Sequence, residues 1–216
     1  MKTALLVGAT GLVGGFVLEN LLQEDYFSKV IVLSRKQIAK QHPKLTQIIA
    51  NFDDMENNAS QIVADVIFCC LGTTIKKAGS QAAFKKVDYE YPLKIAEIAK
   101  QNGASTYLII SAMGADKNSF IFYNRVKGEI EEAIAKLNFN TFHILQPSLI
   151  AGQRKKKRTG ENIANKFFPI VNKLLIGSLS KYKSIQAPQI AKAMVHFAKS
   201  DTKGVMIHDS GELQKI

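Results

Sequence analysis

The sequence has few cysteines, few acidic residues and no long apolar run, and each shortage narrows the kinds of protein it can encode. Among its 216 residues there are two cysteines, Cys69 and Cys70, which are adjacent. Neighbouring side chains of a strand point to opposite faces, so a structural disulfide between them is not expected. No zinc-ligand spacing exists, and no metal site is predicted. These features indicate a reducing compartment, and we expect a cytoplasmic protein.

The weakly polar stretch at the start of the chain reaches Leu18 and is interrupted by four glycines before Glu19. A membrane-spanning helix needs ~20 consecutive apolar residues, so we expect no membrane span here or elsewhere in the chain. A strand, a turn and the start of a helix explain this stretch better than a signal peptide does.

Positive charge is what the sequence has in excess. Its 29 lysines and arginines against 18 acidic residues give a net charge of +11, to which the run Arg154–Arg158 contributes five charges. A basic balance favours anionic partners such as phosphates, nucleic acid or acidic membranes. No RNA-binding or zinc-finger motif accompanies the basic run, so no specific nucleic-acid partner is expected. A generic binder of nucleic acid stays one of the hypotheses.

Short apolar runs alternate with helical patterns along most of the chain. Strands are predicted at Thr3–Val7, Val30–Leu33, Gln47–Ala50, Asp65–Leu71, Tyr107–Ser111, Thr141–Leu145 and Val205–His208, and helices at Leu12–Gln23, Tyr91–Gln101, Tyr123–Leu137 and Pro188–Lys199. Runs that are apolar on both faces are typical of a parallel sheet covered by helices. We therefore predict an α/β fold, a doubly wound parallel sheet in one domain over 1–216, with 148–185 as a small C-terminal lobe.

A glycine-rich loop connects the first predicted strand to the first predicted helix. It consists of Gly8, Ala9, Thr10, Gly11, Leu12, Val13 and Gly14. This context is the one that a dinucleotide-binding fingerprint requires, since the helix N-terminus offers free N–H groups to a pyrophosphate. The glycines allow a tight turn, a close approach of the backbone to the ligand and close helix-to-strand packing. We predict a dinucleotide cofactor here and a Rossmann-type sheet; a purely structural turn is the alternative.

The end of the second predicted strand indicates which dinucleotide binds. NAD-binding proteins usually carry an acidic residue there that accepts from the ribose 2′-OH, whereas this chain has Ser34, Arg35 and Lys36. A guanidinium can hold a 2′-phosphate that a carboxylate would repel. NADP(H) is therefore predicted over NAD(H), the alternative being that Arg35 and Lys36 are ordinary surface charges.

Leu71, Gly72 and Thr73 follow the fourth predicted strand. Ligands of open α/β sheets bind beyond the carboxyl ends of the strands, and small residues there let the backbone pass along the cofactor ribose. These three residues are therefore predicted to contact the cofactor. The neighbouring Cys70 is better explained as a buried, inert thiol.

Tyr123 and Lys127 stand one turn apart on a predicted helix and therefore share a face. The lysine ammonium can stabilise a phenolate and hold the nicotinamide ribose, and a tyrosine so activated can give or take a proton in carbonyl or alcohol redox chemistry. Ser111, at the end of the fifth predicted strand, could hydrogen-bond the same substrate oxygen. These three are the candidate catalytic residues, and an ordinary helix face is the alternative.

Several motifs together make the chain resemble a known family. They are Gly8–Gly11 with Gly14, Phe68–Thr74, Lys77–Gly79, Val87–Tyr89, Ser111 with Gly114–Asp116, Tyr123 with Lys127–Glu129, and Pro147. From about Thr3 to Pro169 the chain resembles the Tat-interactive-protein-like branch of the atypical short-chain dehydrogenases/reductases, and its Cys-Cys-Leu-Gly-Thr-Thr run is the most specific match. The resemblance implies a Rossmann-type fold, NADPH binding and a Ser/Tyr/Lys site.

The resemblance also suggests further contacts and shows two departures. Phe52 and Asp53 lie where related reductases contact adenine, a loop cap being the alternative for Asp53, and Pro147–Ser148 resembles the segment that passes the nicotinamide. Members often carry a serine pair where Ser111 is here followed by Ala112, so an alignment shifted by one position leaves only the tyrosine and the lysine. Asp88 stands near the place of an asparagine that many short-chain reductases use, and the sequence assigns it no role.

Three functions are compatible with this sequence. The first is an NADP(H)-dependent oxidoreductase acting on a carbonyl or alcohol substrate of unknown identity. The second is an NADPH-sensing regulatory or scaffold protein with little turnover, which the basic run motivates, and the third is the nucleic-acid binder. Apolar residues at helical spacing over 161–176 predict a substrate-side helix, with Phe167 and Phe168 walling the substrate cleft. A homodimer or a protein partner is left open.

Overall fold

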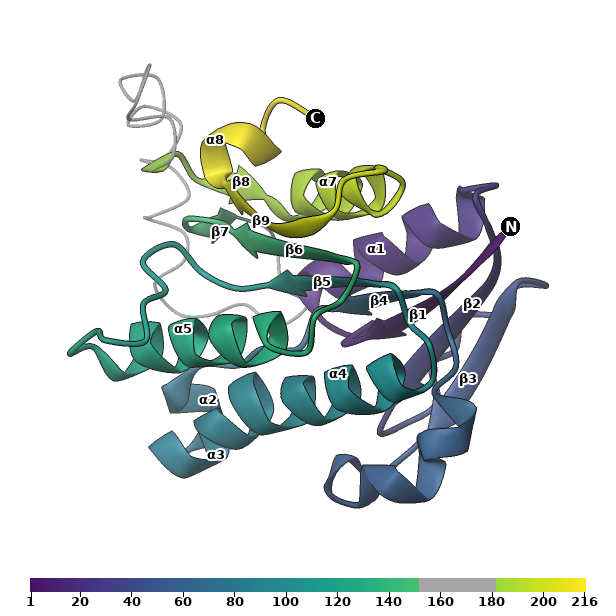
Figure 1. Cartoon of the computed structure of the whole chain (residues 1–216), viewed down its shortest axis with the longest axis horizontal. Helices are drawn as coiled ribbons and strands as arrows, with labels where there is room; N and C mark the ends of the chain where they lie inside the picture. The colour runs from purple at the N-terminus through teal and green to yellow at the C-terminus, as the bar shows by residue number, and fades with distance from the viewer. Residues whose placement is uncertain (152–181) are drawn as a thin grey trace.

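One parallel sheet of seven strands runs through the molecule. The computed structural model describes residues 1–151 and 182–216, and the strand order is β3-β2-β1-β4-β5-β6-β9 (Figure 1). The strands are β1 (Lys2–Val7), β2 (Phe27–Ser34), β3 (Leu45–Ile49), β4 (Val66–Cys69), β5 (Thr106–Ile110), β6 (Thr141–Gln146) and β9 (Gly204–Asp209). A separate parallel pair consists of β7 (Ile150–Ala151) and β8 (Ile185–Gln186).

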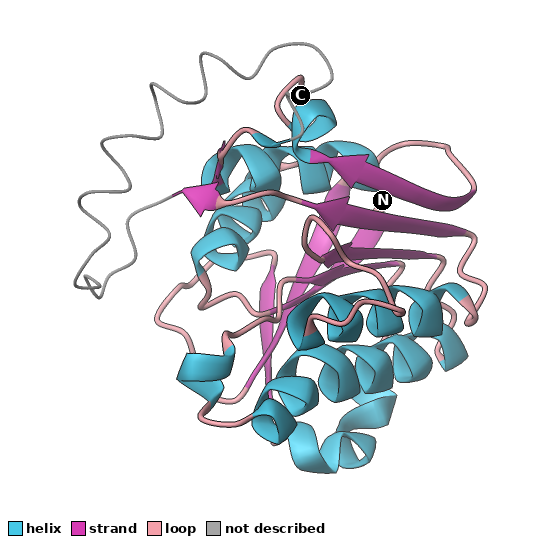
Figure 2. Cartoon of the chain, turned by 90° about the vertical axis from the view of Figure 1, so that its left-hand side faces the viewer, coloured by secondary structure: helices cyan, strands magenta, loops and turns pink. Residues whose placement is uncertain are grey.

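Helices cover both faces of this sheet (Figure 2). One face carries α1 (Leu12–Gln23) and α7 (Ala187–Ala198), and the other carries α4 (Tyr91–Gln101) and α5 (Phe122–Ala135). The shorter elements are the 3-10 segment η1 (Phe52–Gln61), α2 (Ile75–Ala78), α3 (Gln81–Lys85), the π-helical segment η2 (Lys86–Glu90) and α8 (Ser210–Leu213). The predicted Rossmann-type, doubly wound α/β fold is thereby confirmed.

Alternate residues of each central strand enter two separate cores. Leu6, Phe68 and Leu108 pack under α1 and α7, whereas Leu5 and Ile67 pack under α4 and α5. Both faces of the strands are therefore buried, which is why the sequence shows continuous apolar runs there rather than an alternation.

The elements predicted within the described residues are present, with differences at their ends. The helices over 12–23 and 91–101 have the predicted bounds, while β2 begins earlier than predicted because Phe27 is buried and pairs with Lys2. The short helical elements between 52 and 90 were not predicted, since one or two turns leave little periodicity to detect. Their signal is in the caps: the hydroxyls of Thr74 and Ser80 accept from backbone N–H groups of α2 and α3.

The direction in which strands are added reverses at β1. On one side β1 pairs with β2 and on the other with β4, both in parallel register, so Ala4 lies between Val30 and Val66. In open sheets of this kind, ligands bind in the crevice beyond the carboxyl ends of the strands at such a switch point. The fold therefore places a ligand site where Gly8 leaves β1.

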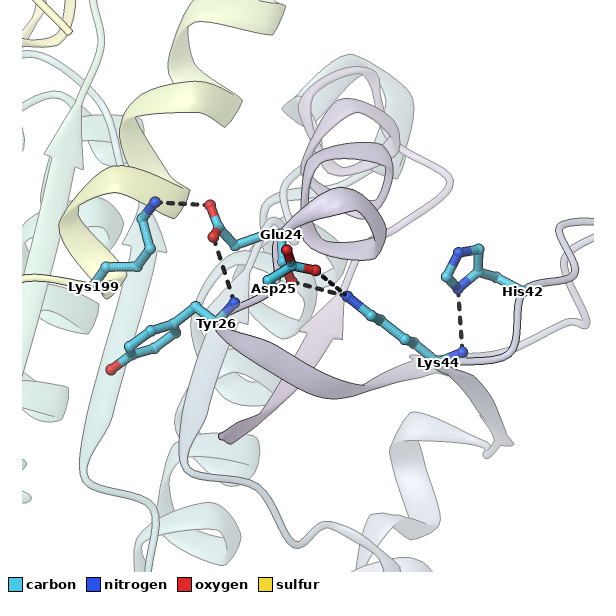
Figure 3. Close-up of polar contacts among 6 residues, drawn as sticks. All are labelled: Glu24, Asp25, Tyr26, His42, Lys44 and Lys199. Atoms are coloured by element: carbon cyan, nitrogen blue, oxygen red, sulfur yellow. Dashed lines mark hydrogen bonds and ion pairs between the residues drawn. The ribbon is translucent and has the colours of Figure 1, made fainter.

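Charged contacts tie elements together at the opposite, amino-terminal edge of the sheet (Figure 3). The Glu24 carboxylate, just after α1, lies 2.7 Å from the Nζ of Lys199 at the end of α7. The Nζ of Lys44 donates to the Glu24 carbonyl at 3.1 Å and lies 3.6 Å from the Asp25 carboxylate. Such solvent-accessible pairs contribute little to stability individually, and they lie at the edge opposite the carboxyl ends of the strands.

The first turn of α1 lies against the backbone of the preceding loop. Gly8 has a φ of +87°, and a Cβ on it would lie 2.5 Å from the Cys70 carbonyl oxygen. A Cβ on Gly14 would lie 2.1 Å from the Gly8 carbonyl oxygen, which itself accepts from the Gly11 N–H at 2.9 Å. The glycines at 8 and 14 therefore let strand, loop and helix approach more closely than any side chain permits.

We expect Gly14→Ala to lower the free energy of unfolding by about 1–3 kcal/mol, because the added methyl displaces α1 from the loop. Gly15→Ala is the matched control, since its Cβ would make an ordinary contact of 3.7 Å in the same helix. Alanine is the better helix former, so this control gains about 0.5–1 kcal/mol. Urea denaturation measures both values, and equal effects of the two substitutions would contradict the close approach at Gly14.

Two histidines connect the last strand to the sheet. The Nδ1 of His143 on β6 lies 2.9 Å from the Nε2 of His208 on β9, whose Nδ1 lies 2.8 Å from the Glu212 carboxylate of α8. Phe197 of α7 stacks on the His208 ring, with centroids 3.8 Å apart. Burial, together with the neighbouring His208, lowers the pKa of His143 to about 4.

This lowered pKa makes stability depend on pH. Between about pH 6.5 and about pH 4 the unfolded chain binds a proton at position 143 that the folded chain does not, so the unfolding free energy falls as the pH falls. We expect His143→Gln to reduce this loss in urea denaturation at several pH values. His42→Gln, at an exposed loop position, is the control that keeps the wild-type slope; an unchanged slope in His143→Gln would show that His143 is not responsible.

Candidate functional site

The predicted site residues at the ends of β1, β4, β5 and β6 lie along one edge of the sheet. Backbone hydrogen bonds continue the ladder beyond the strands: Cys70 N–H donates to the Val7 carbonyl at 2.9 Å, and Ser111 N–H donates to the Leu145 carbonyl at 2.8 Å. Because these four strands are neighbours, the segments Gly8–Gly14, Leu71–Thr73 and Pro147–Ser148 follow them at the same edge.

The glycine loop has the form of an anion cradle. Gly11 is the N-cap of α1, and no side chain caps the helix there. The N–H groups of a first helical turn lack partners within the helix and, together with the helix dipole, favour a negatively charged ligand. The contacts of Gly8 and Gly14 leave no room for a side chain at these two positions, so the backbone of the loop can approach a ligand closely and the residues present fit a bound pyrophosphate.

The loop after β2 presents unpaired positive charge. Ser34 is buried, and its hydroxyl donates to the Lys36 carbonyl at 2.7 Å, which shapes the turn. The side-chain amide of Gln47 on β3 holds this loop: its oxygen accepts from the Ile38 N–H, and its nitrogen donates to the Ile38 carbonyl. Arg35 and Lys36 are exposed and make no ion pair with any described residue. Both side chains are therefore available to an anionic group.

The Asp53 carboxylate at the start of η1 is held by residues that the sequence analysis did not single out. It accepts from the Tyr91 hydroxyl at 2.7 Å and lies 2.7 Å from the Nζ of Lys86, which lowers its pKa. Phe52 is buried and packs edge-to-face on Tyr91. The capping side chain of this turn is Asn51, which accepts from the Asp53 N–H, so Asp53 is not the cap.

Lys127 is buried on α5 one turn after Tyr123, and its charge is met by Asp88. The Lys127 Nζ lies 2.7 Å from Oδ1 of Asp88, and the two side chains are only 5% and 1% exposed. The other carboxylate oxygen, Oδ2, accepts from the Thr73 N–H at 2.8 Å. Asp88 therefore links α5 to the loop after β4, a role that the sequence did not assign.

The ion pair keeps the lysine charged in its buried position. Burial opposes the charged form of Lys127, but the adjacent Asp88 carboxylate and the nearby Tyr123 favour it, and the pKa of Lys127 is raised. Tyr123 is half-buried and packs on the ring of Phe84, with centroids 5.5 Å apart. The predicted Tyr123/Lys127 pair thus shares a helix face at the carboxyl edge, with a fixed ammonium beside the phenol.

Ser111, directly after β5, contacts a residue farther along α5. Its hydroxyl donates to the carboxylate of Glu131, which is buried on α5 two turns beyond Tyr123. The Gln146 amide at the end of β6 donates to both carboxylate oxygens, at 3.1 and 3.0 Å. Within the described part of the chain, the Ser111 hydroxyl contacts Glu131 and makes no hydrogen bond with Tyr123 or Lys127. Glu131 was missed, although it continues their four-residue spacing.

Ser148 is anchored by the end of the chain. Its N–H donates to the hydroxyl of the buried Ser210, on α8, at 2.7 Å, and its own hydroxyl donates to the Lys183 carbonyl. The sequence offered no signal for Ser210, because 62 residues separate the two serines. The segment after β6 is therefore held in place by α8.

Within 1–151 and 182–216, no group of histidine, cysteine and acidic residues is arranged to hold a metal ion. Across the same ranges, no helix is long and apolar enough to span a bilayer. Cys69 and Cys70 are both free thiols, as expected, and burial raises the pKa of Cys70 well above its ordinary value. The predicted basic run at 154–158, the helix at 161–176, Phe167 and Phe168 lie outside the described residues.

Comparison with known proteins identifies the family of the chain. A family model described as NAD(P)H-binding matches residues 8–165. The chain is 36% identical to Protein HTATIP2 of Rattus norvegicus over 171 residues, which covers 77% of this chain and 70% of that protein. It is 35% identical to "Protein fmp52, mitochondrial" of Emericella nidulans over 205 residues, covering 91% and 87% of the two chains.

Solved structures with the same fold include two that are informative. The oxidoreductase ylbE of Lactococcus lactis superposes with a TM-score of 0.69 at 19% identity, over 99% of this chain and 94% of that one. The enzyme WbmH of Bordetella bronchiseptica, in complex with NAD+, superposes with a TM-score of 0.73 at 16% identity, over 98% and 77%. These two likenesses concern the fold alone. From the family model and the relatives, the chain belongs to the NAD(P)H-binding family, in the atypical short-chain dehydrogenase/reductase branch that contains HTATIP2 and FMP52.

Proposed function

We propose that the chain is an NADP(H)-dependent oxidoreductase that transfers hydride to or from the carbon of a carbonyl or alcohol substrate. The observation that supports this best is the buried Lys127, paired with Asp88 at 2.7 Å and one helical turn from Tyr123. A buried ammonium is unfavourable unless its surroundings meet its charge. A role in stabilising the Tyr123 phenolate during proton transfer explains why Lys127 lies one turn from Tyr123 at the carboxyl edge.

Each loop at the carboxyl edge is predicted to bind a different part of the cofactor. Gly8–Gly14 would hold the pyrophosphate, Phe52 and Asp53 the adenine, and Leu71–Thr73 together with Pro147–Ser148 the ribose and nicotinamide side. When bound, the nicotinamide supplies or accepts the hydride. Arg35 and Lys36, which are exposed and unpaired among the described residues, would hold the 2′-phosphate with charged hydrogen bonds.

The chain's own residues would handle the proton. In the direction of reduction, the Tyr123 hydroxyl gives its proton to the substrate oxygen as the carbon receives hydride; in oxidation, the proton returns to the phenolate. Lys127 stabilises the charge that develops on the phenolate, and Asp88 fixes the position of Lys127. The predicted role of Ser111, to hydrogen-bond the same oxygen, requires that its hydroxyl be free to do so.

A second candidate function is NADPH sensing with little turnover. One observation favours it: the single proton of the Ser111 hydroxyl is already donated to Glu131, so it is not available to a carbonyl oxygen. A protein partner or a homodimer would fit this function, and no specific nucleic-acid partner is proposed. The proposed location is cytoplasmic, whereas the fungal relative of Emericella nidulans is named as a mitochondrial protein.

We expect Tyr123→Phe to lower kcat/KM by about 100-fold or more, because the general acid/base is lost. The measurement is NADPH consumption with a panel of aldehydes and ketones, and NADPH formation with the corresponding alcohols. The dissociation constant for NADPH should change less than about twofold, since the phenol hydroxyl contributes little to the binding of the phosphates. Tyr26→Phe, at an exposed position beyond the opposite edge, is the control. Full activity of Tyr123→Phe would rule out Tyr123 as the acid/base, whereas tight NADPH binding without turnover of any compound would favour the sensing function.

We expect Arg35→Ala to weaken NADPH binding by about 10- to 100-fold and to leave NADH binding unchanged, because a charge-assisted hydrogen bond to the 2′-phosphate is lost. Titration of both cofactors by fluorescence measures this. Lys29→Ala removes one positive charge from the other end of β2 and should alter neither affinity. A wild-type preference for NADH would contradict the assignment of Arg35.

A further inference from the structure

A largely buried polar cluster lies one helical turn beyond the proposed proton-transfer residues, and Ser111 is the one member to which the mechanism above gives a role. It consists of Ser111 from β5's carboxyl end, Glu131 from α5, and Gln146 from β6's carboxyl end. Tyr123, Lys127 and Glu131 follow one another at four-residue intervals, so they occupy one face of α5. The cluster is therefore connected to the site through the helix that carries both.

The hydrogen bonds of this cluster have a definite direction. The Gln146 amide nitrogen donates to both oxygens of Glu131, at 3.1 and 3.0 Å, and the Ser111 hydroxyl donates to Oε1. A carboxylate can only accept, whereas a hydroxyl has one proton to donate and two lone pairs. While Glu131 is ionised, Ser111 therefore presents lone pairs alone to any further partner.

A carbonyl substrate needs the opposite arrangement, because its oxygen can only accept a hydrogen bond. The oxygen of an alcohol that donates its own proton to the Tyr123 phenolate likewise has only lone pairs left for Ser111. If Glu131 instead holds a proton, it donates to the Ser111 oxygen, and the Ser111 proton is released to the substrate. The charge of Glu131 thus decides whether Ser111 can assist either direction of the reaction.

The surroundings of Glu131 shift its ionisation to higher pH than that of an exposed glutamate. Burial raises its pKa, and the hydrogen bonds from Ser111 and Gln146 oppose this in part. Among the described residues, Lys127 on α5 is the charged group that acts on Glu131, and it also favours ionisation. Lys127 is itself paired with Asp88 of η2, while β5 and β6 present the neutral Ser111 and Gln146, and no described contact brings a titratable group of α4 to Glu131.

We propose that Glu131 is a positioning residue that controls Ser111: as a carboxylate it takes the Ser111 proton, and as a neutral acid it leaves that proton free for the substrate oxygen. This proposal rests on the proposed function of the Tyr123 site. It also explains why Ser111 can lie near a redox site although its hydroxyl proton is donated to Glu131 in the structure.

Glu131→Gln is the decisive variant, because it reproduces the neutral acid in shape and hydrogen bonding. Its amide nitrogen can donate to Ser111, and its amide oxygen can accept from Gln146. We expect wild-type kcat/KM for carbonyl reduction to fall as the pH rises through the raised pKa of Glu131, because Glu131 then ionises and takes the Ser111 proton. Glu131→Gln should lose this part of the pH dependence and exceed the wild type about tenfold at the upper end, the value of one net hydrogen bond.

Two variants make the comparison specific. Glu129→Gln is the same chemical change on the same helix, at a partly exposed residue paired with Lys85, and it should keep the wild-type profile. Ser111→Ala should abolish the difference between the wild type and Glu131→Gln, since Glu131 acts through that hydroxyl. Parallel pH profiles of the wild type and Glu131→Gln, with turnover intact, would overturn the proposal and leave the proposed function standing.

A second measurement does not depend on turnover. Because the folded-state pKa of Glu131 is raised, ionisation is less favourable in the folded chain, and stability is lost as the pH rises above 4.5. The melting temperature of Glu131→Gln should therefore rise relative to the wild type with increasing pH, whereas that of Glu129→Gln should not. Equal pH dependence of the melting temperature in Glu131→Gln and the wild type would overturn the proposal, whether or not a substrate is found. Failure to find a substrate would count only against the proposed function.

Discussion

The ion pair between Lys127 and Asp88 holds three separate segments of the site together. Lys127 comes from α5 and Asp88 from η2, while the Thr73 N–H after β4 binds the second carboxylate oxygen. Both side chains are almost completely buried, and buried charges persist only where the opposite charge and the hydrogen bonds are in place. Charge as well as apolar packing therefore aligns α5 with the loop after β4, and Tyr123 acquires its position one turn away as a consequence.

The two halves of the site use different physical means. On the α1 side, backbone N–H groups favour an anion. The glycines bring the N-terminus of α1 against the ends of β1 and β4, so no charged side chain is needed there. On the α5 side, the proposed chemistry depends on side chains, and one helix face carries Tyr123, Lys127 and Glu131. The topological switch at β1 places both halves at the same edge.

Most of the fold could be predicted from the sequence, because the apolar runs of the strands and the periodicity of the helices are local patterns. Continuous apolar runs identified the buried parallel strands, and helical periodicity with a glycine stop identified the helix over 91–101 with its observed bounds. The elements between 52 and 90 escaped prediction for the same reason, since one-turn helices and the π-helical segment that presents Asp88 have no period of their own.

By itself, the sequence predicted where a dinucleotide would bind and determined which tyrosine and lysine share a helix face, because these features are set by spacings of a few residues. The tertiary structure decided what surrounds them. Asp88 meets Lys127 across 39 positions of sequence, Ser111 meets Glu131 across 20, and Ser148 meets Ser210 across 62. Such partners are selected by the order of strands in the sheet and by the need to satisfy buried polar groups, and neither leaves a short-range pattern in the sequence.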